Sequence, residues 1–210
     1  LAAKRITAGG YGYSGQTCIS VQRVYVHQDV ADEFLDAFQA QVSELVVGDP
    51  ADDATNVSAL IDSDETNRVA GAVTEAIAEG ATAVIGGDDV SDGLLTPTVL
   101  MDVDVDMAVS RTEVFGPVVG VARYSDVNDA FAWANDTRYG LQAGIFTNDL
   151  SLGIEAAHRL DYGGVCVNEV PTYRTDQMPY GGVRDSGNTK EGPAWAVREM
   201  TEERMVVIAR

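Results

Sequence analysis

The alternation of apolar and polar residues predicts strands that are separated by helices. Residues 21–26 (VQRVYV) are rich in β-branched side chains and alternate, which is typical of a strand. Val30, Phe34 and Phe38 then follow at helical spacing, with Asp29 as the expected N-cap of that helix.

The same succession of signals recurs to the end of the chain. Ser63 is expected to cap a helix that ends at Gly80, before a short buried strand at 82–87. Further strands are expected at 114–124, 142–147, 163–168 and 204–209, with helices between most of them. Strands joined by helices pair in parallel, so the fold class is α/β: three layers, with a mostly parallel sheet and helices on both faces.

Composition narrows the range of partners. The chain has 210 residues, 45% of them hydrophobic, with 33 Asp and Glu against 14 Lys and Arg and a formal net charge of -19. This charge repels phosphate backbones and anionic lipids, so we expect neither nucleic acid nor a membrane as partner. No apolar run is long enough for a membrane span, and only two cysteines are present, so we expect a cytoplasmic protein. The scattered acidic residues favour a halophilic surface.

Cys18 is the first candidate for chemistry. It follows a glycine-containing turn in "SGQTC", which leaves amide N–H groups free to face a developing oxyanion. Taken alone, the pattern also fits a small buried cysteine. Cys166 lies in the apolar stretch "GGVCVN", where core packing is favoured.

Three other stretches are candidates for part of a ligand-binding or catalytic site. Glu113 and Phe115 are two residues apart before a Gly-Pro turn, and in an extended segment they would project on the same side, a carboxylate beside an aromatic ring. Asn168 ends an expected strand, where open α/β sheets bind their ligands. Residues 178–192 hold four glycines and a proline, which indicates an unusual loop.

Together and in this order, these stretches resemble the aldehyde dehydrogenase superfamily over essentially the whole chain. The segments that carry the resemblance are Gly15-Gln16-Thr17-Cys18, Glu113-Val114-Phe115-Gly116-Pro117, Tyr139-Gly140-Leu141, Asn168, Pro179-Tyr180-Gly181-Gly182, Ser186-Gly187, Glu191-Gly192 and Thr201-Glu202. Residues 173–187 (YRTDQMPYGGVRDSG) look most like the branch of lactaldehyde and non-phosphorylating glyceraldehyde-3-phosphate dehydrogenases.

The resemblance implies NAD- or NADP-dependent oxidation of a small aldehyde to a carboxylic acid. Cys18 would be the nucleophile, forming a thiohemiacetal and then a thioester. Glu113 would hold the nicotinamide ribose and Phe115 would pack beside the nicotinamide. Asn168 would line the aldehyde site, and Glu191 would act as a secondary proton relay.

The resemblance also implies a domain organisation. Residues 1–200 correspond to the catalytic domain and 201–210 to a C-terminal strand of the oligomerisation region, in a homodimer or homotetramer. The family's general-base Glu, oxyanion-hole Asn and dinucleotide-binding domain have no match in this chain, which starts abruptly at Leu1, so we expect upstream sequence to be missing and the chain alone to be inactive.

Two alternatives from other function classes remain open. A cysteine hydrolase would need a histidine within hydrogen-bond reach of Cys18, and the chain has His27 and His158. A non-catalytic assembly fragment would use residues 204–209 as an edge strand.

The acidic surface leads to a first prediction, that the protein becomes more stable as salt rises. The screening length for charge interactions shortens from about 10 Å at 0.1 M to about 3 Å at 1 M salt. Repulsion between the acidic side chains of the folded state is thereby reduced. The melting temperature is therefore expected to rise from low salt to molar KCl. A flat or falling melting temperature would contradict the halophilic interpretation.

Overall fold

A four-stranded sheet forms the centre of the molecule. In this computed structural model, which describes residues 1–87 and 89–210, the strand order is β1-β6-β5-β2. β1 (Arg23–His27), β6 (Val118–Tyr124) and β5 (Thr98–Met101) run parallel, and β2 (Thr82–Ile85) is antiparallel to β5. The expected mostly parallel sheet is confirmed.

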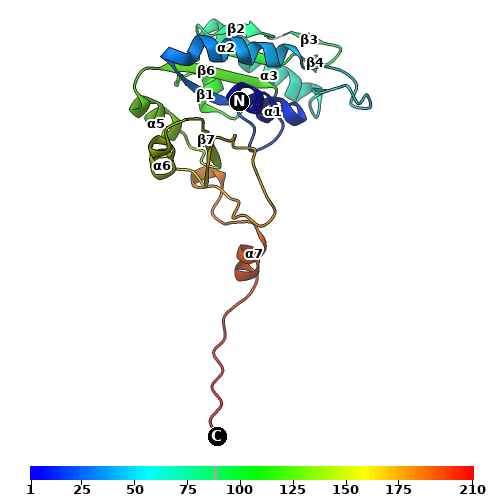
Figure 1. Cartoon of the computed structure of the whole chain (residues 1–210). Coiled ribbons are helices and arrows are strands. Elements are labelled where there is room, and N and C mark those ends of the chain that lie inside the picture. Colours follow the sequence, from blue (N-terminus) through cyan, green and yellow to red (C-terminus); the bar gives the residue numbers. More distant parts are fainter. Residues whose placement is uncertain (88) are drawn as a thin grey trace.

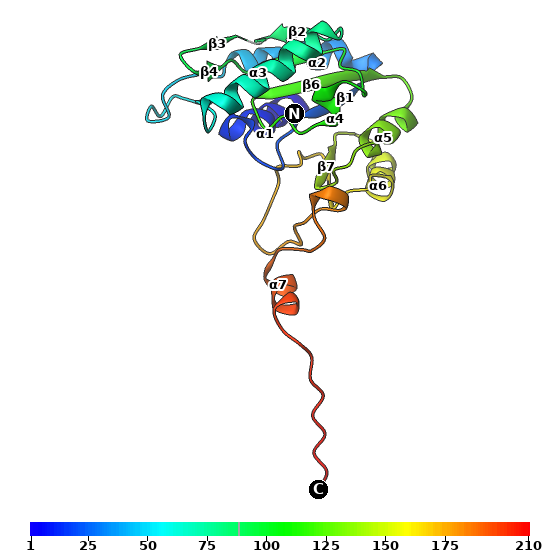
Figure 2. The same cartoon turned by 180° about the vertical axis from the view of Figure 1, so that it is seen from behind.

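Helices cover both faces of this sheet. α1 (Ala2–Tyr11) and α2 (Gln28–Ser43) lie on one face, and α3 (Ser63–Ala78) and α4 (Ala108–Arg111) lie on the other (Figures 1 and 2). Along the strands, side chains alternate between the two sides, so Val119 joins the core with α1 and α2, whereas Leu100 joins the core with α3. The three-layer α/β architecture is thereby confirmed.

A second, two-stranded parallel sheet lies beneath the main sheet in the view of Figure 1. β7 (Gln142–Ile145) pairs with β8 (Gly164–Val167), and α5 (Val127–Asn135) and α6 (Leu150–Arg159) pack against them. The core of this unit contains Phe131, Ala156 and Leu160.

The structure corrects several details of the predicted elements. β2 pairs antiparallel because it reaches β5 through the short hairpin of β3 (Val90–Ser91) and β4 (Leu94–Leu95), with no helical crossover. The helix expected after Asp29 begins earlier, because His27 Nδ1 accepts the Asp29 N–H and serves as N-cap. Asp62, rather than Ser63, caps α3 by accepting the Glu65 N–H at 2.8 Å.

The C-terminal region leaves the body of the molecule. After η2 (Arg184–Ser186) and α7 (Pro193–Glu199), residues 201–210 form no secondary structure and are exposed, extending away as a tail (Figures 1 and 2). A strand at 201–210 that pairs only with another subunit is not tested by a single chain and stays a prediction. Within residues 1–87 and 89–210, no helix combines the length and apolar character that crossing a membrane would require.

Candidate active site

The turn that leads into Cys18 is built from unusual backbone geometry. Tyr13, Ser14 and Gly15, in η1 (Gly12–Gly15), have φ values of 52°, 56° and 73°, in the left-handed region. L-residues are disfavoured there by about 1–2 kcal/mol each, so the surrounding structure must hold the turn. The Ser14 hydroxyl does so by donating to the Ser58 carbonyl at 2.9 Å and accepting the Ser58 N–H at 3.0 Å.

Gly15 brings this turn into direct backbone contact with the turn at Gly116-Pro117. A Cβ atom at Gly15 would overlap the Gly116 carbonyl oxygen, and the positive φ disfavours a side chain as well. The sequence predicts a turn at each place, but their close approach is a tertiary feature. It fixes the position of Cys18 relative to the segment that carries Glu113 and Phe115.

Gln22 makes a second connection between the two segments. Its side-chain nitrogen donates to the Val109 and Thr112 carbonyls at 2.9 and 2.8 Å, and its oxygen accepts the Val114 N–H at 2.8 Å. The backbone is therefore held on both sides of Glu113. The sequence predicts only a strand position for Gln22, because nothing local in the sequence distinguishes it from a solvent-facing glutamine.

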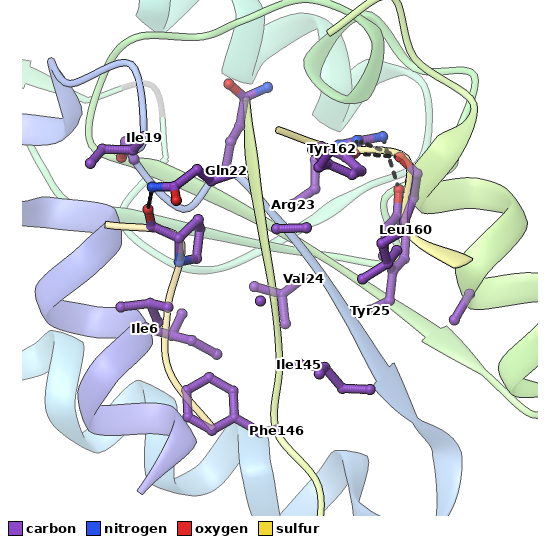
Figure 3. Close-up of a pocket in the computed structure, with 18 of the residues that line it drawn as sticks. Ile6, Ile19, Gln22, Arg23, Val24, Tyr25, Ile145, Phe146, Leu160 and Tyr162 are labelled. Atoms are coloured by element: carbon purple, nitrogen blue, oxygen red, sulfur yellow. Dashed lines mark hydrogen bonds between the residues drawn. The ribbon is translucent and has the colours of Figure 1, made fainter. Parts of the chain in front are cut away.

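Glu113 and Phe115 line the same cavity as Cys18. The cavity has a volume of about 750 Å³, and both side chains are exposed toward solvent. Figure 3 shows part of its wall, with Val24 and Tyr25 of β1 and Ile145 of β7 among the lining residues. The segment is not the regular extended one that was expected, because Phe115 has a φ of 53°.

The Glu113 carboxylate makes no hydrogen bond or ion pair within the described residues. A carboxylate accepts hydrogen bonds from a diol, and an exposed aromatic ring offers a flat apolar face. Glu113 and Phe115 therefore present a hydrogen-bond acceptor and a flat apolar face on the same cavity.

Cys18 differs from Cys166 in accessibility. Cys18 is exposed and its backbone N–H has no partner within the part of the chain that the structure describes, whereas Cys166 is half-buried in β8. Burial, followed by the nearby Glu169 carboxylate, raises the pKa of the Cys166 thiol. The accessible thiol next to a free amide is therefore Cys18.

Tyr180 contacts the Cys18 sulfur although the two residues are 162 positions apart. The distance from Tyr180 Oη to Cys18 Sγ is 3.1 Å, and Tyr180 itself is only 8% exposed. Burial, then the hydrogen bond and charge of Cys18 and the charge of Glu191, raise the pKa of Tyr180 well above its ordinary value. The Arg174 guanidinium opposes this shift.

Glu191 is connected to Cys18 indirectly, through Arg174 and Tyr180. The Glu191 carboxylate accepts from Arg174 Nη2 at 2.9 Å, and the Arg174 guanidinium lies 4.7 Å from the centre of the Tyr180 ring. The Tyr180 and Glu191 backbones also form an antiparallel bridge. Its role as a proton relay stays a prediction.

Asn168 lies at the carboxyl end of β8, as expected, in the left-handed conformation with φ 59°. Its side-chain oxygen accepts the Thr147 N–H at 2.9 Å and so joins the loops that follow β7 and β8. Over the described ranges it is not among the residues that line the cavity, whereas Thr147 and Glu169 are. Contact of Asn168 with an aldehyde stays a prediction.

The two histidines do not serve Cys18. His27 caps α2 and lies against Tyr124, and His158 lies in the last turn of α6. Within residues 1–87 and 89–210, neither forms a hydrogen bond with the Cys18 sulfur, so the hydrolase alternative lacks its base. The same residues contain no group of His, Cys, Asp or Glu side chains that could hold a metal ion.

Comparison with known proteins agrees with this geometry. Residues 1–206 match the model of the aldehyde dehydrogenase family. The 3-sulfolactaldehyde dehydrogenase of Priestia megaterium is 46% identical over 208 residues, covering 99% of this chain and 43% of that protein. The lactaldehyde dehydrogenase of Methanococcus vannielii is 42% identical over 208 residues, covering 99% and 44%.

Solved structures give the same assignment. The glyceraldehyde-3-phosphate dehydrogenase GapN of Methanocaldococcus jannaschii, complexed with NADP, superposes with a TM-score of 0.91 at 37% identity, covering 94% of this chain and 43% of that one. An aldehyde dehydrogenase of Physcomitrella patens, in complex with the reaction product succinate, has a TM-score of 0.92 at 38% identity, covering 95% and 41%.

The chain belongs to the aldehyde dehydrogenase family. The resemblance inferred from the sequence is confirmed, including the similarity to lactaldehyde dehydrogenases. The chain spans less than half the length of the curated relatives that it matches.

The contact at Gly15 leads to a prediction about the integrity of the site. Gly15→Ala is expected to displace the Gly116-Pro117 turn, because the new Cβ would overlap the Gly116 carbonyl oxygen. In addition, the backbone at Gly15 has a positive φ, which alanine disfavours. In the complete protein, hydride transfer and the melting temperature should both fall. Gly12→Ala is the matched control, since a Cβ there meets no atom within 4 Å. Equal behaviour of the two variants would refute the close contact.

Proposed function

We propose that this chain carries the catalytic cysteine of an NAD- or NADP-dependent aldehyde dehydrogenase. The observation that carries the proposal is the exposed Cys18 on the cavity that Glu113 and Phe115 also line, with a backbone N–H that has no partner among the residues the structure describes. These features lie in a chain that matches the family over residues 1–206.

Cys18 begins the reaction by adding its thiolate sulfur to the carbonyl carbon of the aldehyde. A carbon–sulfur bond forms, the carbonyl π bond breaks, and the oxygen becomes an oxyanion that accepts the Cys18 N–H. Collapse of this thiohemiacetal leaves a thioester on Cys18 and releases a hydride, which the nicotinamide cofactor would accept. Water then adds to the thioester carbonyl, the carbon–sulfur bond breaks, and the carboxylic acid and the free Cys18 thiol are formed. Glu191 is proposed as a relay for a proton in this last step.

Glu113 and Phe115 are proposed to hold the cofactor. The chemistry that NAD or NADP supplies when bound is hydride acceptance. Glu113 would accept hydrogen bonds from the two ribose hydroxyls, and Phe115 would limit the position of the flat ring next to it. Gln22 keeps the Glu113 backbone in place during this binding.

The proposed substrate is a short 2-hydroxyaldehyde. This proposal is supported by the similarity of the chain to a 3-sulfolactaldehyde dehydrogenase, at 46% identity, and to a lactaldehyde dehydrogenase, at 42% identity. Asn168 is proposed to contribute to aldehyde binding from the end of β8, after a change in its present bond to Thr147.

The intact protein is proposed to be a cytoplasmic homodimer or homotetramer. Residues 206–208 (Val-Val-Ile) are 71%, 81% and 83% exposed in the single chain, and their backbone has no partner within the described ranges. An apolar extended segment of this kind is suited to pairing with the sheet edge of a neighbouring subunit. The acidic charge of -19 supports a halophilic setting for this assembly.

The nucleophile assignment predicts selective labelling and selective loss of activity. Brief iodoacetamide treatment of the native protein should label Cys18 and largely spare the half-buried Cys166, because the thiolate must be accessible to react. In the complete protein, Cys18→Ser should abolish NAD(P)H production with lactaldehyde. Mass spectrometry of peptides and absorbance at the NAD(P)H band are the measurements.

Cys166→Ser is the matched control for this experiment. It should retain most of the aldehyde-dependent NAD(P)H production, with a cost only in stability. Preferential labelling of Cys166, or full activity of the Cys18→Ser protein, would contradict the proposed function.

A further inference from the structure

We infer that Tyr180 is a second catalytic residue, whose phenolic hydroxyl donates a hydrogen bond to the Cys18 thiolate and holds it ready for attack. The inference rests on the proposed function, since it gives Tyr180 a role only if Cys18 is the nucleophile. It concerns a residue that touches the reacting sulfur directly.

The contact is well defined by the packing around it. Tyr180 Oη lies 3.1 Å from Cys18 Sγ, within the range of hydrogen bonds to sulfur, and the Tyr180 side chain is 8% exposed. Its backbone is fixed by two hydrogen bonds to Glu191, with N–O distances of 3.2 and 2.6 Å. The ring therefore has a fixed direction toward the sulfur.

The direction of the hydrogen bond follows from the chemistry of the two groups. A thiolate has no proton and can only accept, while the phenol keeps its proton across the physiological pH range. Hydrogen bonds to ionised groups are about twice as strong as neutral ones. The hydroxyl thus stabilises the negative charge on the attacking sulfur of Cys18.

Arg174 and Glu191 support this donor from the far side. The Arg174 guanidinium lies 4.7 Å from the centre of the Tyr180 ring, and a cation over the ring draws electron density from the phenol and strengthens its O–H as a donor. Glu191 holds Arg174 in position at 2.9 Å. Toward the Cys18 sulfur both act through Tyr180, as positioning residues, and this is separate from the proton relay proposed for Glu191 in the hydrolysis step.

The test is the pH dependence of Cys18 alkylation in the complete protein, with iodoacetamide as probe. Tyr180→Phe keeps the ring, the stacking with Arg174 and the backbone bridge, and removes only the hydroxyl. Loss of one hydrogen bond to a charged group should move the midpoint of the rate profile up by about one pH unit. At pH 7 alkylation and NAD(P)H production should fall about tenfold.

A structural effect would not reproduce this pattern. At high pH, where both proteins are ionised at Cys18, the alkylation rate of Tyr180→Phe should equal or slightly exceed that of the wild type, because a more basic thiolate is the better nucleophile. Tyr173→Phe is the matched control, since its ring is 51% exposed in the same segment, and it should leave the profile unchanged.

The outcomes separate the inference from the proposed function. Labelling at Cys18 with identical pH profiles in wild type and Tyr180→Phe would overturn the role of Tyr180 alone. A rate that falls equally at every pH would also overturn it, because that result indicates a displaced site. Absence of labelling at Cys18 in the wild type would overturn the proposed function itself.

Discussion

The structure of this site depends on one close backbone contact, between Gly15 and the carbonyl of Gly116. This contact leaves no room for a side chain at Gly15. The left-handed backbone conformation from Tyr13 to Gly15 brings the chain close enough to Gly116 for the contact to form. Such strain persists only where the surroundings impose it, and here Ser14 is held by Ser58. The contact places the Cys18 loop and the Glu113 segment on one cavity.

The sulfur is approached from two sides that are far apart in sequence. The turn before Cys18 sets its position and leaves its backbone N–H without a partner in the described part of the chain, while Tyr180 reaches the sulfur from the glycine-rich loop 178–192. Behind Tyr180, Arg174 lies over its ring and forms an ion pair with Glu191, and both of these side chains are exposed to solvent. The Cys18 sulfur is therefore exposed and at the same time in hydrogen-bond contact with Tyr180.

The sequence predicted the elements better than their contacts. Periodicity and capping signals predicted most helices and strands. The ordered motifs singled out Cys18, Glu113 and Phe115, and the structure shows that all three line one cavity. The sequence pattern did not predict β5 (Thr98–Met101), because all four of its residues are buried. The strand therefore lacks the alternation of apolar and polar residues by which half-buried strands are recognised. Tyr180 was noted only as part of a motif, since its contact with a sulfur 162 positions away depends on tertiary packing.

The Cys18 loop and the Glu113 segment are held together by contacts within the protein itself, at Gly15 and at Gln22. Gln22→Met tests this claim most directly, because this change removes the hydrogen bonds on both sides of Glu113 and leaves Cys18 untouched. The account predicts that the dissociation constant for NAD(P)H, measured by fluorescence on the complete protein, rises about tenfold while Cys18 alkylation stays near the wild-type rate. An unchanged dissociation constant would contradict it.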